Sequence, residues 1–185
     1  GRAAPTVELR VVDDTGHDAA PGDRGEIWIK GPTVMAHGYW RRPDANAAAF
    51  TDGWFHTGDI GYLDPDGYLF LVDRVKDQIV TGGGNVYSVE VENAIASHPA
   101  VAQVAVIGVP SETWGEAVHA IVVLRPDATA TEVEIIEHAR GWIAGYKLPK
   151  SVEFRPEPLP LSGAMKVLKR ELRDPYWAGR ERAVN

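Results

Sequence analysis

The sequence predicts an α+β fold, with a strand-rich first part and a second part in which strands and helices alternate. In the first part, apolar residues alternate in short runs such as Val7, Leu9 and Val11, and clusters of Gly, Pro and Asp separate the runs. In the second part, apolar runs alternate with segments that have helical caps and spacing. We therefore expect a β-rich segment over residues 1–75 and a compact α+β domain over residues 76–185.

The second part is expected to contain a mixed sheet and a glycine hairpin. Residues 101–109 and 117–124 are apolar enough to be central strands, and residues 151–155 return as a further strand. Within residues 77–87, three consecutive glycines separate two short apolar runs. Glycine permits positive φ and leaves room for close approach, so this hairpin could admit a ligand.

Two helices are predicted from their caps. Ser88 is the expected N-cap of the first helix. Thr131 and Glu134 form a capping box that opens the second, and Gly145 with Pro149 is expected to end it. The expected core-facing residues are Val91, Ala94 and Ile95 in the first helix and Ile136, Ala139 and Ile143 in the second.

Composition narrows the classes of function. The formal net charge is −7, whereas binding to a phosphate backbone needs clustered Lys and Arg, so we expect no nucleic-acid partner. The absence of cysteine excludes disulfides, thiolate metal ligands and a cysteine nucleophile. The six histidines lack metal-ligand spacing, and we expect no metal site in this chain. No apolar run approaches the roughly 20 residues that span a bilayer, so no transmembrane segment is expected.

One carboxylate and one guanidinium are expected to meet across a turn. Asp59 follows Thr57-Gly58, and its two acceptor oxygens could accept hydrogen bonds from both hydroxyls of a ribose. Arg74 lies beyond the sequence Asp64-Pro65-Asp66-Gly67, which has the composition of a tight turn. Taken alone, the pair fits an ordinary surface ion pair better than a binding site.

A second segment, near the C-terminus, makes a binding site the better interpretation of this pair. Residues 159–166 place Lys166 in a loop rich in Pro, Gly and Ser, directly before a basic, helix-prone stretch over residues 167–173. Together with residues 54–92, this segment resembles the C-terminal part of the AMP-forming acyl-CoA synthetases, which belong to the adenylate-forming enzymes with peptide adenylation domains and firefly luciferases. The resemblance covers essentially the whole chain.

The resemblance implies roles for individual residues. Lys166 matches the lysine that bridges the substrate carboxylate and the α-phosphate of ATP, where a positioned cation stabilises the crowded negative charge. Asp59 would bind the ribose hydroxyls, and Arg74 would bind the ribose from the strand end.

The same resemblance implies a second site and a hinge. Lys76 would be the hinge about which a small domain rotates. Gly83 and Gly84 would line the tunnel for the pantetheine arm of coenzyme A. Rotation would present the loop of Lys166 for adenylation and then the glycine hairpin for thioester formation.

The implied protein is an acid–thiol ligase. Residues 1–75 correspond to the end of its large N-terminal adenylating domain, and residues 76–185 to its small, mobile C-terminal domain. Such an ATP-dependent, AMP-forming acyl-CoA ligase converts a carboxylic or fatty acid, ATP and coenzyme A into acyl-CoA, AMP and pyrophosphate through an acyl-adenylate. Mg²⁺ is expected for the full enzyme, with no ligand to it in this chain. A cytoplasmic location is implied, and peripheral membrane contact is left open.

Several expectations concern the chain as a fragment. It begins without methionine, and the family's phosphate loop and acyl pocket would lie upstream of Gly1. We therefore expect the isolated chain to be inactive, and its exposed strands to self-associate. Met165 stands where glycine is usual, so a positive φ there would store about 1–3 kcal/mol of strain. Two alternatives remain open: a non-catalytic binding or regulatory module that retains the fold, and a peptide-synthetase adenylation domain.

Overall fold

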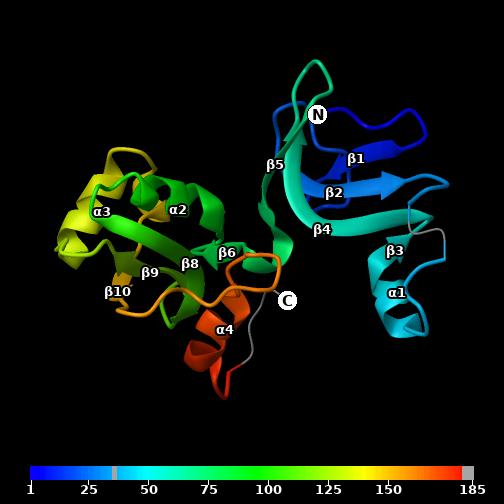
Figure 1. The fold of residues 1–185 in the computed structure, drawn as a ribbon. Helices are drawn as coiled ribbons and strands as arrows, with labels where there is room; N and C mark the ends of the chain where they lie inside the picture. The colour runs from blue at the N-terminus through cyan, green and yellow to red at the C-terminus, as the bar shows by residue number, and fades with distance from the viewer. Residues whose placement is uncertain (35–36, 181–185) are drawn as a thin grey trace. The chain divides into compact units, whose positions relative to one another are not determined.

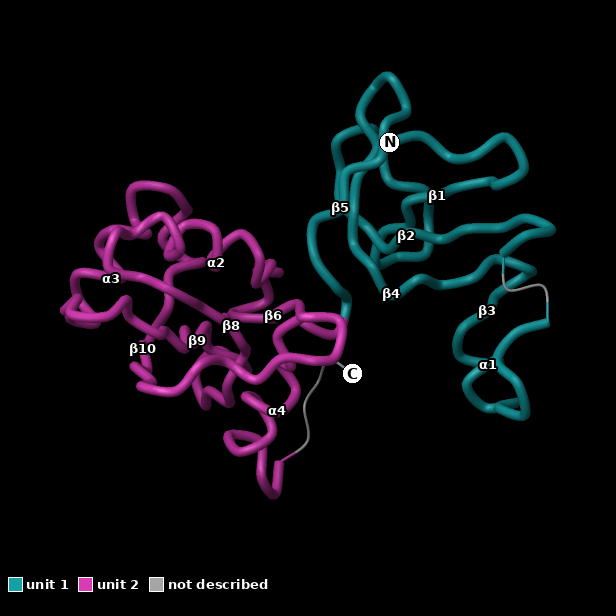
Figure 2. The backbone as a smooth tube through the Cα atoms, viewed as in Figure 1, with its two compact units in different colours: residues 1–75 teal, residues 76–185 magenta. Residues whose placement is uncertain are grey.

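The computed structural model describes residues 1–34 and 37–180 and divides into two compact units, residues 1–75 and residues 76–185 (Figure 2). Each unit has its own five-stranded sheet. Four α-helices occur in the described residues, so the predicted α+β class is confirmed. The assignment of the units to the domains of a longer enzyme stays a prediction.

The first unit is built around one long strand (Figure 1). In chain order its elements are β1 (Glu8–Val12), β2 (Gly25–Lys30), α1 (Pro43–Ala49), β3 (Phe50–Thr51), β4 (Trp54–Leu63) and β5 (Leu69–Arg74). All pairings are antiparallel, and β4 pairs with β2, β3 and β5. The buried apolar residues of this sheet are Val11, Val12, Ile27 and Ile60. Of the alternating apolar residues in β1 and β2, Val11 and Ile27 are buried, whereas Leu9 and Ile29 are only partly buried.

The helix α1 has no counterpart in the sequence-based expectation of a mostly β unit. Pro43 occupies the first turn and Asp44 follows it, which are ordinary signals of a helix start. None of its residues is buried, so the segment lacks the apolar periodicity by which an amphipathic helix is identified.

The second unit is a mixed sheet with helices. Its strands are β6 (Ile79–Thr81), β7 (Gly84–Val86), β8 (Val101–Ser111), β9 (Gly115–Leu124) and β10 (Ser151–Phe154), and its helices are α2 (Ser88–Ala96), α3 (Glu132–Arg140) and α4 (Lys169–Arg173). Three short 3-10 segments are η1 (Val75–Asp77), which begins at the last residue of the first unit, η2 (Gly145–Lys147) and η3 (Asp174–Trp177). The strands β8 and β9 form a long antiparallel pair, and β10 runs parallel to β9. The predicted central strands and the returning strand are confirmed.

Both faces of this sheet are covered, which explains why its central strands are apolar throughout. On β8, Val106 belongs to the core that contains residues of α2 and α3, whereas its neighbours Ala105 and Ile107 belong to the core that contains Leu172 of α4. Figure 1 shows α2 and α3 on one face of the sheet and α4 on the other. The alternation of side chains along a strand therefore serves two cores instead of one core and solvent.

The start of α2 differs from the prediction. Tyr87 is the N-cap, with extended backbone, and Ser88 is the first helical residue. Ser88 is fully buried, and its hydroxyl accepts a hydrogen bond from Lys169 Nζ at 2.6 Å. The predicted capping role of Ser88 is therefore wrong, because Ser88 lies one residue inside the helix, and its hydroxyl instead accepts from a lysine distant in sequence.

The capping box of α3 is confirmed, whereas its end is not. Glu134 N–H donates to Thr131 Oγ1, and the N-cap N–H donates to the Glu134 carboxylate. The helix ends before Gly141, four residues earlier than expected. Ile135 is the fully buried isoleucine of this helix, and Ile136 and Ile143 are only partly buried.

Candidate functional site

In the first unit, Asp59 and Arg74 are brought together by the β4–β5 hairpin. The two residues are paired in register, and Arg74 Nε lies 3.1 Å from Asp59 Oδ1. The predicted turn is present: Asp64 Oδ1 accepts hydrogen bonds from the N–H groups of Asp66 and Tyr68, and Gly67 adopts φ +78°. The side chains of Asp59 and Arg74 are 34% and 50% exposed, so a ligand can reach both.

The backbone at Asp59 is fixed by side chains of the same sheet. Gly58 adopts φ +70°, and its N–H donates to Glu26 Oε1 at 3.0 Å. Thr57 Oγ1 donates to Ile27 O at 2.7 Å and accepts from Asp59 N–H at 3.1 Å. An exposed ion pair is worth only about 0–1 kcal/mol. The pair with Arg74 therefore contributes little to stability, and its value is the oriented carboxylate.

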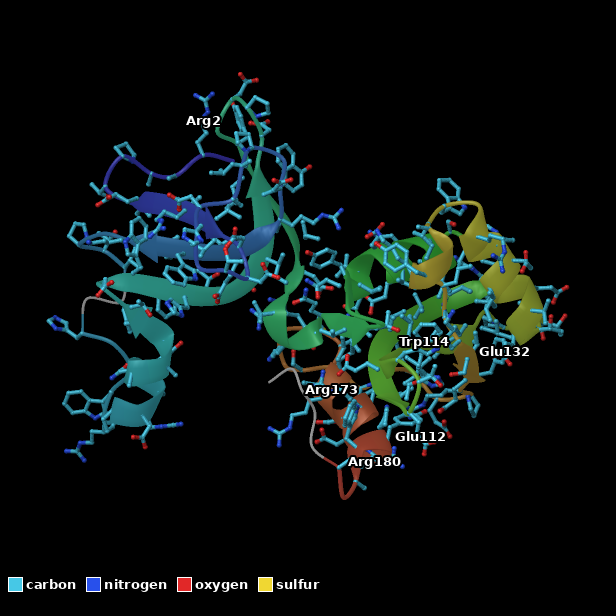
Figure 3. All side chains as sticks on the ribbon, turned by 180° about the vertical axis from the view of Figure 1, so that it is seen from behind. Arg2, Glu112, Trp114, Glu132, Arg173 and Arg180 are labelled. Carbon is cyan, nitrogen blue, oxygen red and sulfur yellow. The ribbon has the colours of Figure 1, made fainter. Side chains whose placement is uncertain are left out.

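In the second unit, Lys76 is the first residue and lies in η1. Its carbonyl accepts a hydrogen bond from Arg173 Nη1 at 3.2 Å, and Arg173 also lies 3.5 Å from Asp77 Oδ1. The side chains of Arg173 and Asp77 are only 14% and 15% exposed. Figure 3 labels Arg173, which ends α4. The chain leaving Lys76 is thus fixed to the C-terminal helix of its own unit, a contact that the sequence did not reveal.

The predicted glycine hairpin is present, and we use this name for residues 79–86. Its strands β6 and β7 are joined by Gly82 and Gly83, which adopt φ +57° and +79°. Positive φ at both turn residues is the geometry that matches the twist of paired strands. A Cβ on Gly83 would meet no atom within 4 Å, so this residue borders open space.

Two aromatic rings flank the turn of the glycine hairpin. A Cβ on Gly82 would lie 2.9 Å from Cε3 of Trp114, and a Cβ on Gly84 would lie 3.7 Å from Cε2 of Tyr146. Trp114 and Tyr146 are both about half exposed, and Trp114 projects from the connection between β8 and β9 (Figure 3). In the sequence, a lone tryptophan before Gly115 does not by itself distinguish this position from core packing.

A buried carboxylate supports the glycine hairpin from behind. Only Thr81 of β6 pairs with β9, through Gly115. At the preceding residue, Val80 N–H donates to Glu116 Oε2 at 3.0 Å, so a side chain replaces the missing strand partner. Glu116 is 2% exposed. Its role follows from a contact across 36 residues and could not be seen in the sequence.

Lys166 lies on a tight loop, residues 159–168, which we call the lysine loop. Met165 N–H donates to Ser162 O at 2.9 Å, and Ser162 N–H donates to Lys166 O at 2.8 Å. Leu168 N–H closes the loop by donating to Pro160 O at 2.8 Å. Lys166 is exposed, as expected for a cation that must reach a ligand.

Met165 adopts φ +59° and is 76% exposed. It follows the turn that begins at Ser162, a position at which the left-handed conformation is needed and glycine is favoured. Met165 therefore has the positive φ for which backbone strain was expected. A residue with a Cβ in this conformation costs roughly 1–2 kcal/mol.

His119 takes part in packing and in local hydrogen bonds. His119 is 6% exposed and lies between Ser151 Oγ at 2.7 Å and the hydroxyl of Tyr176 at 3.1 Å. Burial lowers the pKa of His119 below its ordinary value. Burial and the hydrogen bond that Tyr176 donates to Glu153 raise the pKa of Tyr176 to about 12. This cluster attaches η3 to the strands β9 and β10.

The described residues contain neither a cluster of metal-ligand side chains nor a helix that could span a membrane. Within residues 1–34 and 37–180, no group of three or more His, Asp or Glu is placed to hold a metal ion. Over the same part of the chain, none of the helices has the length and apolar character needed to cross a bilayer.

Known proteins resemble this chain along nearly all of its length. A family model described as the AMP-binding enzyme C-terminal domain matches residues 90–166. A long-chain-fatty-acid–CoA ligase from Yersinia pestis is 50% identical over 174 residues, which cover 94% of this chain and 30% of that protein. A fatty acid–[acyl-carrier-protein] ligase, ScoC, from Streptomyces coeruleorubidus is 42% identical over 100% of this chain and 35% of that protein.

A solved structure is similar to this chain in fold. The crystal structure of ATP-bound MatB from Rhodopseudomonas palustris superimposes with a TM-score of 0.88 at 43% identity, and the match covers 95% of this chain and 35% of that one. The chain therefore spans about a third of the length of the relatives it matches.

Proposed function

We propose that this chain, which belongs to the AMP-forming acyl-CoA synthetases as a C-terminal part, supplies two sites to a longer ligase that activates a carboxylic acid and transfers it to a thiol. The observation that carries this proposal is the identity of 42–50% to acid-activating ligases over at least 94% of the chain. The relatives are acyl-CoA and related ligases, so an adenylate-forming ligase is the class that they support.

For the adenylation step, we assign nucleotide binding to Asp59 and Arg74. The Asp59 carboxylate has acceptor capacity beyond its bond to Arg74 and can accept from both ribose hydroxyls. Arg74 orients that carboxylate and can donate to the ribose from the strand end. Half-exposure of the pair supports this assignment, because a ligand can approach without unfolding the hairpin.

Lys166 is assigned to the reacting groups. The transition state of adenylation brings the negative charge of a carboxylate against that of the α-phosphate, and a positioned ammonium offsets the repulsion. An exposed lysine at the end of a closed loop can reach both groups with its flexible side chain. Mg²⁺ is expected for the full enzyme, and within residues 1–34 and 37–180 we assign no ligand to it.

We assign thioester formation to the glycine hairpin. Lys76 is assigned as the hinge about which the small domain rotates between adenylation and thioester formation. The open space at Gly83 and the absence of a side chain at Gly84 suit the passage of a thin pantetheine arm. We take coenzyme A as the thiol and a fatty acid as the acid, because the Yersinia relative is named for both. ScoC, whose name specifies an acyl-carrier protein, makes the thiol acceptor a point to be tested. The cytoplasmic location stays a prediction.

The test is ATP–pyrophosphate exchange by the full-length protein that carries this chain, measured against short-chain, long-chain and aromatic carboxylates. We expect exchange with a fatty acid, followed by transfer to coenzyme A. Transfer to an acyl-carrier protein alone would correct the acceptor. Exchange at background with every acid would contradict the proposal.

The isolated 185-residue chain should not catalyse this exchange, because it spans only about a third of the length of the relatives it matches. Exchange well above background with the purified chain would contradict this expectation. Light scattering would show whether the chain also self-associates, as its exposed strand edges predict.

One observation favours a second candidate, a non-catalytic module that retains the fold. Met165 places a strained, exposed side chain next to Lys166, where glycine would be unstrained. If this strain displaces the lysine, the full-length protein would bind ATP without pyrophosphate exchange, and Met165→Gly would restore the exchange.

A further inference from the structure

A second lysine, Lys169, follows the lysine loop and differs from Lys166 in being largely buried. Lys169 is the first residue of α4, and its side chain is only 13% exposed. Its ammonium lies 2.7 Å from Glu92 Oε1 and donates to Ser88 Oγ at 2.6 Å. The adjacent Arg170 has a side chain that is 85% exposed. Lys169 is thus largely shielded from solvent, whereas Lys166, three residues earlier, is exposed.

The partners of Lys169 are themselves fixed. Ser88 is fully buried in the first turn of α2, and the side chain of Glu92 is 17% exposed. Glu92 Oε1 also accepts a hydrogen bond from Val106 N–H at 2.8 Å, which ties it to β8. Since α2 begins directly after β7, Lys169 connects the base of the lysine loop to the element that continues from the glycine hairpin.

Stability alone is a poor explanation for such a pair. Removing two charges from water costs several kcal/mol per ion, and buried ion pairs are often replaceable by apolar residues without loss of stability. A buried pair does fix geometry, because its ions cannot separate without leaving a charge unpaired. The arrangement therefore constrains where α4 begins, and hence where the lysine loop ends.

We propose that Lys169, through Glu92 and Ser88, is a positioning residue for Lys166. This inference rests on the proposed adenylation role of Lys166. The hydrogen bond from Leu168 N–H to Pro160 O closes the loop next to Lys169, so a shift of the Lys169 backbone is passed to the whole loop. Lys169 itself touches no substrate in this account.

The structural part of the proposal is tested by amide hydrogen exchange in the 185-residue chain. Lys169→Met should speed exchange at the N–H groups that close the lysine loop by about tenfold or more, the change expected when about 1.4 kcal/mol of local stabilisation is lost. Those N–H groups belong to Ser162, Met165, Lys166 and Leu168. Exchange in α3 should stay unchanged. Unchanged exchange in the lysine loop would overturn the proposal.

A matched control uses Glu90, which lies on α2 as Glu92 does. Lys147 Nζ lies 2.6 Å from Glu90 Oε1, with side chains 14% and 29% exposed, but Lys147 belongs to η2 and not to the lysine loop. Lys147→Met should leave exchange in the lysine loop unchanged. If it speeds exchange there as much as Lys169→Met does, general destabilisation explains both variants, and the proposal is wrong.

The functional part is tested by the two half-reactions of the full-length ligase. Lys169→Met should lower kcat of pyrophosphate exchange by about 10- to 100-fold, as displacement of a reacting group by about 1 Å does, while KM for ATP changes little. Transfer from supplied acyl-adenylate to coenzyme A should persist, and Lys169→Arg should restore most of the exchange. Parallel loss of both half-reactions would overturn the positioning role.

A double variant separates positioning from folding. Lys169→Met with Glu92→Gln leaves no unpaired buried charge and keeps an amide oxygen that can accept from Val106 N–H, so it should unfold at a temperature close to that of the parent. Exchange of pyrophosphate should still be impaired in this variant. Full activity of the folded double variant would show that the pair is dispensable. If the parent ligase itself gives no exchange with any acid, the proposed function fails, and the amide-exchange experiment still decides whether Lys169 holds the loop.

Discussion

The glycine hairpin and the lysine loop belong to the same unit and are built in opposite ways. The hairpin is part of the sheet, where Ile79 and Val86 are fully buried and Glu116 holds Val80 from behind. The lysine loop lies outside the named strands, is exposed at its tip and is attached at its base by Lys169. A rigid hairpin suits a site that offers backbone to a thin ligand, whereas an exposed loop suits a side chain that must reach two reacting groups. The difference leads us to expect that variants of the two regions fail in different half-reactions.

The largest expected effect comes from removing the ammonium of the lysine loop. In the full-length ligase, Lys166→Ala should lower pyrophosphate exchange by about 10²–10³-fold, by analogy with deletion of one donor to a developing charge. The circular dichroism of the variant should match that of the parent, because Lys166 is exposed. Retention of more than about a tenth of the exchange rate would remove Lys166 from the reacting groups.

A substitution at Lys76 tests whether the two regions act in turn. Lys76→Pro fixes φ near −65° and restricts Val75 to extended conformations, so it should block one of the two poses of a hinge. One half-reaction should fall by about tenfold or more, equivalent to about 1.4 kcal/mol, while the other persists. Parental rates in both half-reactions would show that Lys76 is not the hinge. Since Arg173 fixes the Lys76 carbonyl, Arg173→Met offers a second way to disturb this residue.

Removal of the carboxylate behind the glycine hairpin should destabilise the second unit. Glu116→Ala leaves the Val80 N–H without this acceptor, which costs about 1–3 kcal/mol for a buried donor. Chemical denaturation should report this loss, and thioester formation should fall more than adenylation. The exposed neighbour Glu112, labelled in Figure 3, gives the control Glu112→Ala, for which no comparable loss is expected. Equal stability of the two variants would mean that Glu116 does not support the hairpin.

The smallest expected effect is at the tip of the lysine loop. Met165→Gly relieves roughly 1–2 kcal/mol of left-handed strain, while glycine costs about 0.5–1 kcal/mol in chain entropy. The free energy of unfolding should therefore rise by at most about 1.5 kcal/mol. Met165→Ala keeps the Cβ and should show no such gain. A loss of stability in Met165→Gly would mean that the methionine side chain makes a contact worth more than the strain.

The parts of the fold that depend on local chemistry were predictable from the sequence. The turn through Gly67, the glycine hairpin and the capping box at Thr131 each need particular residues at particular backbone angles, and the structure contains all three. The meeting of Asp59 and Arg74 followed from the turn between them. Their roles, and that of Lys166, rest on the resemblance to a family and stay proposals.

The parts that depend on distant partners could not be predicted. Lys169 and Ser88 are separated by 81 residues, and the sequence presents one as a surface cation and the other as a helix cap. Arg173 reaches the carbonyl of Lys76 across 97 residues. Propensity describes a residue's local options, and tertiary packing selects among them. The helix α1 was missed for a different reason, because a helix without buried residues has no periodic signal.

The lysine loop is assigned to adenylation and the glycine hairpin to thioester formation. This assignment is tested most directly by measuring both half-reactions for one variant of each region. Lys166→Ala changes only the lysine loop. Gly83→Asn adds a side chain where the fold leaves open space, and asparagine tolerates the positive φ at this position. We predict that Lys166→Ala loses pyrophosphate exchange yet transfers supplied acyl-adenylate to coenzyme A, whereas Gly83→Asn exchanges pyrophosphate yet fails in transfer. Loss of the two half-reactions in the same proportion in both variants would contradict the account.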